Sequence, residues 1–215
     1  MKTIKGIWRF SRVICYTFVC LFQAYTRFKR VDRKEKGRML RYYPTQVLKL
    51  AGVRCSYEGN VPELLHECGL TDTPPAYMVL SNHISWLDIF SLDSQLPSRF
   101  IAKAEIAKWP VFGLIAQQIG TLFINRSSKR AILRINDDIR GALCNCEAVT
   151  IFAEGTTTFG NELLPIKANF IAPACEIGAT VQPVILSYKN KGKPTKRAAF
   201  AGDVTLFGSL WNVVT

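Results

Sequence analysis

Short apolar segments alternate with longer amphipathic segments from about residue 77 to the end of the chain. A short apolar run bounded by turn residues is typical of a buried strand, whereas apolar residues spaced three and four apart predict a helix. We expect strands at 77–80, 99–102, 121–124, 149–153, 181–186 and 198–201, and helices at 86–95, 110–119, 129–146 and 167–177. Strands that alternate with helices favour parallel pairing, so the pattern predicts an α/β domain with a mostly parallel central sheet flanked by helices.

The N-terminal part follows a different pattern. Residues 13–26 form an uncharged, mostly apolar run of 14 residues with basic residues on both sides, and a second helix is expected over 36–50. As a helix the run reaches ~21 Å, short of the ~30 Å hydrocarbon core. Its basic flanks and its aromatic residues favour an anchor at the membrane interface. The alternatives are a tilted full span, a buried core helix and a cleaved signal peptide.

The positive charge is concentrated in the same part of the chain. The net charge is +12, and residues 1–60 carry 14 Lys and Arg against 3 acidic residues, which leaves the remainder close to neutral. A nucleic-acid-binding surface would be spread over a folded face, so we expect no nucleic-acid partner and an anionic membrane instead. The 7 cysteines are scattered without a C-x-x-C pair, which predicts neither a disulfide framework nor a metal site and fits a reducing compartment.

A loop-rich stretch begins at Gly59, and its proline-rich segment at 71–75 marks the best domain boundary. We divide the chain where this stretch begins, into basic, membrane-anchoring N-terminal helices at 1–58 and an α/β domain at 59–215. The last residues, 210–215, form an apolar run without a polar tail, which is typical of an element that is cut midway. We expect that the C-terminus is truncated.

His83 and Asp88 stand five residues apart, directly after the predicted strand 77–80. On an unbroken helix five residues turn by ~500°, so the two side chains would face apart. They can meet where His83 lies in the strand-to-helix turn and Asp88 lies inside the new helix. The carboxylate would then fix one imidazole tautomer and leave the other nitrogen as a general base. The alternative is that Asn82 or Ser85 caps the helix and His83 is an ordinary surface residue.

Three further blocks stand at the ends of predicted strands. The block at 120–126 ends on Arg126, the block at 151–158 places Glu154 before a glycine and three threonines, and the third block is V-Q-P-V-I at 181–185. Functional residues of parallel sheets lie at the carboxyl ends of the strands. The four blocks should therefore converge on one edge of the sheet.

The motifs N-H-x-S-x-x-D, G-x-x-F-I-x-R, F-x-E-G-T and V-x-P-V, in this order over about 77–186, resemble the glycerolipid acyltransferase family that includes 1-acyl-glycerol-3-phosphate acyltransferases. The resemblance implies that family's fold and the transfer of a fatty acyl group from an acyl-thioester, carried by coenzyme A or acyl carrier protein, to the hydroxyl of a lysolipid. It implies that His83 is the base and Asp88 its partner. It further implies that the substrate is bound by Arg126, Glu154, Gly155, Thr156 and Lys103.

The implied chemistry requires no metal and no bound cofactor, because the acyl-thioester is a co-substrate. Backbone N–H groups near Gly155 are the expected donors to the oxyanion of the tetrahedral intermediate. Thioester donors and reduced cysteines together predict action at the cytoplasmic face of the inner membrane.

The third block departs from the pattern of lysophosphatidate-specific members, which carry proline before the glutamate and arginine after the threonine. Here Ala153 and Thr157 stand at these positions, and a threonine cannot replace a bidentate guanidinium. The favoured acceptor is 1-acyl-glycerol-3-phosphate, which would give phosphatidate, and the alternative is a lyso-ornithine lipid or another lysophospholipid. An alternative of a different class is a non-catalytic, basic protein that binds membrane surfaces.

Overall fold

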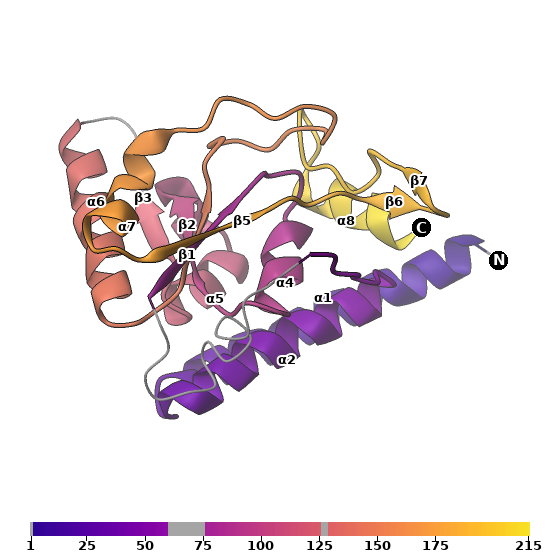
Figure 1. The fold of residues 1–215 in the computed structure, drawn as a ribbon. Helices are drawn as coiled ribbons and strands as arrows, with labels where there is room; N and C mark the ends of the chain where they lie inside the picture. The colour runs from indigo at the N-terminus through magenta and orange to yellow at the C-terminus, as the bar shows by residue number, and fades with distance from the viewer. Residues whose placement is uncertain (1, 60–75, 126–128) are drawn as a thin grey trace.

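The computed structural model describes residues 2–59, 76–125 and 129–215 (Figure 1). Its α-helices are α1 (Lys2–Gln23), α2 (Arg33–Ala51), α4 (Leu87–Asp93), α5 (Phe112–Gln118), α6 (Lys129–Cys144), α7 (Ala172–Glu176) and α8 (Leu206–Val214). Its strands are β1 (Tyr77–Ser81), β2 (Arg99–Lys103), β3 (Leu122–Ile124), β4 (Val149–Phe152), β5 (Thr180–Val184), β6 (Lys189–Asn190) and β7 (Lys193–Pro194). A π-helical turn at Ala24–Phe28 extends α1.

Five strands form one sheet in the order β3-β2-β4-β1-β5, and every neighbouring pair is parallel. The predicted parallel α/β sheet is therefore confirmed. β1 lies between β4 and β5, with Ser81 opposite Phe152 on one side and Val184 on the other. The ends of three of the four sequence blocks thus meet at one edge of the sheet.

The two faces of the sheet pack against different helices. Because side chains alternate along a strand, β1 sends Met78 toward a cluster with α6 and α7, and Tyr77 and Val79 toward a cluster with α4. Both clusters contain fully buried residues such as Leu143 on α6. The sheet is therefore a middle layer between α6 and α7 on one face and α4 on the other (Figure 1).

The two N-terminal helices form a further layer beyond α4. α2 packs against α4, and α1 runs beside α2 and reaches α8 near the C-terminus (Figure 1). Val13 of α1, Val47 of α2 and Leu210 of α8 share one buried cluster. The start of α2 is fixed by Asp32, whose side chain accepts a hydrogen bond from Glu35 N, and its end by Gly52 at φ 81°.

Some predicted elements differ from the structure. The predicted strand 198–201 is wrong, since these residues form a turn and loop in which Phe200 N donates to Ile84 O instead of pairing with β5. The predicted helix 167–177 is divided into a 3-10 helix at Ala168–Phe170 and the shorter α7, which has Pro173 in its first turn. The apolar run near the C-terminus belongs to α8, which Thr205 caps through Gly208 N.

The predicted membrane segment is part of a longer helix than its apolar run, because the basic residues before the run are helical too. Within the described residues, no helix is both long and apolar enough to cross a membrane. The predicted boundary at 58–59 borders residues 60–75, which lie outside the described ranges. The division into two parts stays a prediction.

Candidate active site

His83 and Asp88 meet at the carboxyl end of β1. His83 lies in the turn after the strand and Asp88 in the first turn of α4, and His83 Nδ1 is 2.8 Å from Asp88 Oδ2. The same oxygen accepts hydrogen bonds from Ile84 N at 2.6 Å and Ser85 N at 2.8 Å. The turn geometry expected from the five-residue spacing is therefore present. Asp88 is fully buried, so these bonds replace its contact with water.

The hydrogen bond to Asp88 determines which nitrogen of His83 is available for chemistry. A carboxylate only accepts hydrogen bonds, so Nδ1 carries the proton and Nε2, on the opposite side of the ring, has a free lone pair. The imidazole stacks on Phe152 with ring centroids 3.9 Å apart and planes 9° apart. Its side chain remains 21% exposed. The ring is therefore held by two contacts and still accessible to a substrate.

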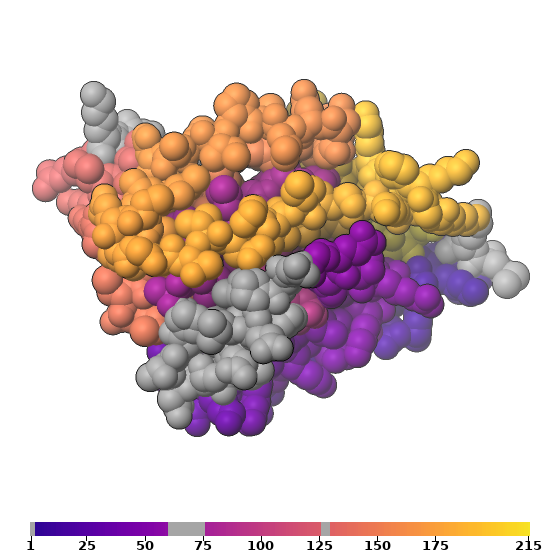
Figure 2. Space-filling model, in the orientation of Figure 1, coloured from indigo at the N-terminus to yellow at the C-terminus, as the bar shows by residue number. Residues whose placement is uncertain are grey.

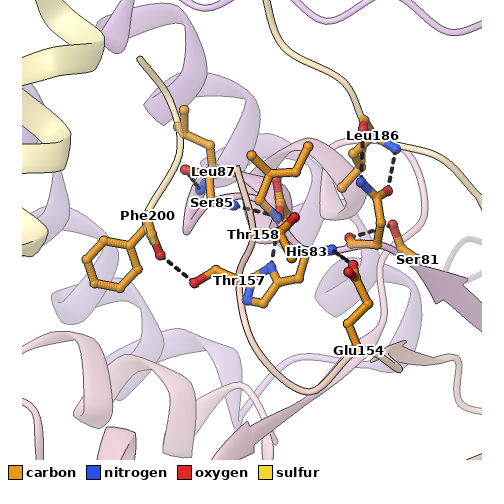
Figure 3. Close-up of polar contacts among 12 residues, drawn as sticks. Ser81, His83, Ser85, Leu87, Glu154, Thr157, Thr158, Leu186 and Phe200 are labelled. Atoms are coloured by element: carbon orange, nitrogen blue, oxygen red, sulfur yellow. Dashed lines mark hydrogen bonds and ion pairs between the residues drawn. The ribbon is translucent and has the colours of Figure 1, made fainter. Parts of the chain in front are cut away.

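Glu154 holds the backbone around His83. Its Oε1 accepts a hydrogen bond from His83 N at 2.8 Å (Figure 3). Its Oε2 accepts one from Leu164 N at 2.9 Å. The residue is 5% exposed. Both carboxylate oxygens are thus occupied by backbone donors, and Glu154 ties the His83 turn to the loop that follows β4.

The loop after β4 folds over the His83 turn. Thr158 N donates to His83 O at 2.9 Å, and Thr157 Oγ1 donates to Phe200 O (Figure 3). Gly155 adopts a φ of 75°, which favours glycine, and its N–H donates to Phe152 O. The Gly155 N–H is therefore engaged in a turn, and the neighbouring N–H groups of Thr156 and Thr157 are the better candidates for oxyanion donors.

His83 lines a cavity of ≈ 660 Å³ between the sheet edge and the N-terminal helices. Most of its lining side chains are apolar, including Phe28, Phe90, Phe112 and Ile115. The α/β domain also contributes Lys103, Gly155, Thr156 and Thr157 to the lining. In the space-filling view, the orange loop after β4 and the yellow-orange segment after β5 flank magenta residues of the β1–α4 region (Figure 2). The arrangement places the basic His83 imidazole at the wall of a largely apolar space.

Two ionisable groups in the cavity wall favour their neutral forms. Burial raises the pKa of the Cys20 thiol to about 12. Burial also raises the pKa of the Asp93 carboxyl well above its usual range, although a hydrogen bond from Ser98 N opposes the shift. Because both groups disfavour charge, this part of the wall suits an apolar ligand.

The predicted site residues are partly brought together. His83, Asp88, Glu154, Gly155 and Thr156 surround one turn, and Lys103 lines the same cavity from the end of β2. Arg126 lies outside the described residues. In the described ranges, no three His, Cys, Asp or Glu side chains gather into a metal site.

α1 and α2 contribute to the cavity, which no sequence motif indicated. Thr17 and Ala24 from the α1 side and Met39 and Pro44 from α2 line the same cavity as His83. No motif indicated Tyr188 either, whose hydroxyl lies 2.6 Å from Asp88 Oδ1. Residues distant in sequence carry no shared motif, so the only signal was the apolar face of each helix.

Comparisons with known proteins find a family model and several curated relatives that match this chain. Residues 55–187 match the family model Acyltransferase. The chain is 44% identical over 143 residues to a 1-acyl-sn-glycerol-3-phosphate acyltransferase of Neisseria gonorrhoeae, covering 66% of this chain and 56% of that protein. It is 41% identical over 131 residues to a lyso-ornithine lipid O-acyltransferase of Pseudomonas aeruginosa, covering 61% and 50%. The chain thus spans about half the length of the curated relatives it matches.

A solved structure shares the fold. The crystal structure of the 1-acyl-sn-glycerophosphate acyltransferase PlsC from Thermotoga maritima aligns with a TM-score of 0.59 at 17% identity, covering 100% of this chain and 95% of that one. At this identity the likeness concerns the fold alone. Since the family model matches more than half of the sequence, including the His83 turn and the Glu154 block, the chain belongs to the Acyltransferase family.

Proposed function

We propose that the protein transfers a fatty acyl group from an acyl-thioester to the free hydroxyl of a lysolipid. The observation that carries this proposal is the His83–Asp88 pair at the wall of an apolar cavity. An acyl chain suits such a cavity, because each buried methylene group stabilises binding by about 0.8 kcal/mol. The names of the relatives point to the same reaction class.

The proposed reaction uses Nε2 of His83 as the base. Nε2 removes the proton from the acceptor hydroxyl while the hydroxyl oxygen attacks the carbonyl carbon of the thioester. The electron pair of the C=O bond moves to the carbonyl oxygen. The tetrahedral oxyanion then collapses, the C–S bond breaks, and the leaving thiolate takes the proton from the imidazolium. Asp88 stabilises that imidazolium through Nδ1. The N–H groups of Thr156 and Thr157 are the proposed donors to the oxyanion, because both residues belong to the cavity lining.

The donor in this proposal is acyl-coenzyme A or acyl carrier protein, and the chemistry needs no metal or bound cofactor. The favoured acceptor is 1-acyl-glycerol-3-phosphate, because Lys103 presents a cation to the cavity that His83 also lines. Thr157 uses its hydroxyl to hold Phe200 O, so it orders the loop. A lyso-ornithine lipid is the second candidate, since a relative carries that name and position 157 lacks a guanidinium.

The acceptor is tested with membranes that contain the protein, a thioester donor, and either lysophosphatidate or lyso-ornithine lipid. We expect phosphatidate as the larger product in lipid mass spectrometry. Lys103→Gln should lower turnover of lysophosphatidate by about 10- to 100-fold, since a hydrogen bond to a charged group contributes about 1.5–3 kcal/mol. Lys108→Gln is the control, because this exposed lysine stands on the next segment outside the cavity lining. Ornithine lipid as the sole product would contradict the phosphate assignment.

We also propose that α1 and α8 dock on an anionic membrane at the cytoplasmic face of the inner membrane. Helical spacing places Ile4, Trp8, Phe18 and Phe22 on one face of α1, and Trp8, Phe18 and Phe22 are 59%, 56% and 63% exposed. α8 adds the exposed rings of Phe207 and Trp211, which are 61% and 37% exposed and lie against Phe10 of α1. Such large exposed apolar side chains, with basic residues beside them, are typical of interfacial helices.

Membrane docking predicts a specific loss of vesicle binding. The triple variant Trp8→Ser, Phe18→Ser, Phe22→Ser should sediment with anionic phospholipid vesicles far less than the wild type, because it removes apolar area without touching the core. Leu133→Ser on α6 is the control, since Leu133 is 66% exposed on a different element. Vesicle binding equal to that of the wild type in the triple variant would refute the proposed docking face.

A further inference from the structure

Tyr188 contacts the buried carboxylate of Asp88 from the side opposite His83. Its hydroxyl lies 2.6 Å from Asp88 Oδ1, whereas His83 Nδ1 lies 2.8 Å from Oδ2. Oδ2 also accepts the two backbone hydrogen bonds from Ile84 and Ser85. Tyr188 thus donates to Oδ1, and both oxygens of the carboxylate accept hydrogen bonds.

Contacts on both sides of Tyr188 in the chain fix its position. Asn82, next to His83, accepts a hydrogen bond from Leu186 N at 2.7 Å and donates one to Leu186 O at 3.0 Å, which fixes the segment after β5 two residues before Tyr188. Beyond Tyr188, Thr195 N donates to Tyr188 O at 3.0 Å. The side chain also packs against the cluster of Leu48, Leu87 and Ala198. The residue that precedes His83 thus also holds the segment that carries Tyr188.

The Tyr188 phenol is the donor in its contact with Asp88. Burial raises the pKa of Tyr188 well above its ordinary value, and the neighbouring Asp88 charge raises it further. The phenol therefore stays protonated, and its O–H donates a hydrogen bond to Asp88 Oδ1. A hydrogen bond from a hydroxyl to an ionised carboxylate is stronger than one between neutral groups.

We propose that Tyr188 is a positioning residue for acyl transfer. Its hydroxyl fixes the plane of the Asp88 carboxylate so that Oδ2 meets His83 Nδ1 and Nε2 stays directed at the substrate. Tyr188 acts through Asp88 and does not belong to the described cavity lining. It also stands just beyond residue 187, where the family match ends. This inference rests on the proposed function, because it requires His83 to be the base.

Tyr188→Phe tests the proposal, since it removes the hydroxyl and keeps the ring. We expect kcat to fall by about 10- to 100-fold, with KM within about twofold of the wild type because the substrate contacts stay. Tyr57→Phe is the matched control: the Tyr57 hydroxyl bonds Ser94 Oγ at 2.9 Å in the same neighbourhood without touching Asp88. Thermal melting of both variants shows that they are folded. Unchanged kcat in Tyr188→Phe, or a rise in KM that accounts for the whole loss, would overturn the proposal.

A double-mutant cycle with Asp88→Asn separates positioning from a general loss of stability. If Tyr188 acts through the carboxylate, adding Tyr188→Phe to Asp88→Asn costs less than about twofold in residual kcat. An additional loss as large as in the wild-type background would overturn the proposal. The wild type and His83→Ala are assayed in parallel. If His83→Ala turns over as fast as the wild type, the proposed function and this inference are both overturned. If turnover depends on His83 but Tyr188→Phe is fully active, the inference alone is overturned.

Discussion

His83→Ala is expected to lower kcat for acyl transfer by at least about 10²–10⁴-fold, the range that general-base catalysis contributes. His83 is the ionisable side chain that the buried Asp88 orients toward the cavity, and alanine leaves the acceptor hydroxyl without a base. The fold should persist, because the ring contributes one stacking contact with Phe152, worth about 0.5–1.5 kcal/mol.

This expectation is checked by initial rates with a thioester donor and a lysolipid, together with circular dichroism of the same preparation. His66→Ala is the matched control, since the sequence contains 2 histidines and His66 has no motif around it. It should keep wild-type kcat. Full activity in folded His83→Ala would remove the base from the mechanism.

Asp88 should matter for both catalysis and stability. Asp88→Asn places an amide group opposite the Ile84 and Ser85 N–H groups and His83 Nδ1, so the imidazole loses its tautomer preference. We expect kcat to fall by about 10²–10⁴-fold, as when the orienting carboxylate of a catalytic triad is replaced. Asp88→Ala leaves buried N–H groups without a partner, and each costs about 1–3 kcal/mol in the free energy of unfolding.

Urea unfolding and steady-state rates on the same variants measure the two effects separately. Asp88→Asn should lose activity with a smaller decrease in the free energy of unfolding than Asp88→Ala. Asp32→Asn serves as the control, because Asp32 also accepts a backbone N–H, from Glu35, at the start of α2. Wild-type kcat in Asp88→Asn would mean that His83 needs no oriented tautomer.

The sequence predicted those features that depend on local pattern. The alternating apolar segments predicted the five strands of the parallel sheet, and the spacing of His83 and Asp88 predicted their meeting in a strand-to-helix turn. The strand pattern and the His83–Asp88 spacing are both properties of short segments. The convergence of the blocks then follows, because strand ends of a parallel sheet gather at one edge. The role of Glu154 as a clamp on the His83 backbone could not be predicted, because it depends on which backbone groups the β4 loop approaches.

Contacts between residues that are distant in the sequence could not be predicted. The apolar run at 198–201 fits a strand by composition, yet Phe200 N donates to Ile84 O and Phe200 O accepts from the Thr157 hydroxyl, both across the fold. Residues of α1 and α2 line the cavity, although the basic and aromatic composition of this part of the chain favoured a membrane anchor. Tyr188 meets Asp88 across 100 residues. Such contacts are set by tertiary packing, which periodicity and motif spacing do not encode.

The most direct test of acyl transfer at His83 follows an isotope-labelled acyl chain from a thioester donor into lipid. Membranes with the wild-type protein, or with His83→Gln, are incubated with the labelled donor and a lysolipid, and the products are identified by mass spectrometry. We predict a labelled diacyl lipid and stoichiometric free thiol from the wild type, and neither above background from His83→Gln. Equal labelling by both proteins, or free labelled fatty acid in place of the diacyl lipid, would contradict acyl transfer at this site.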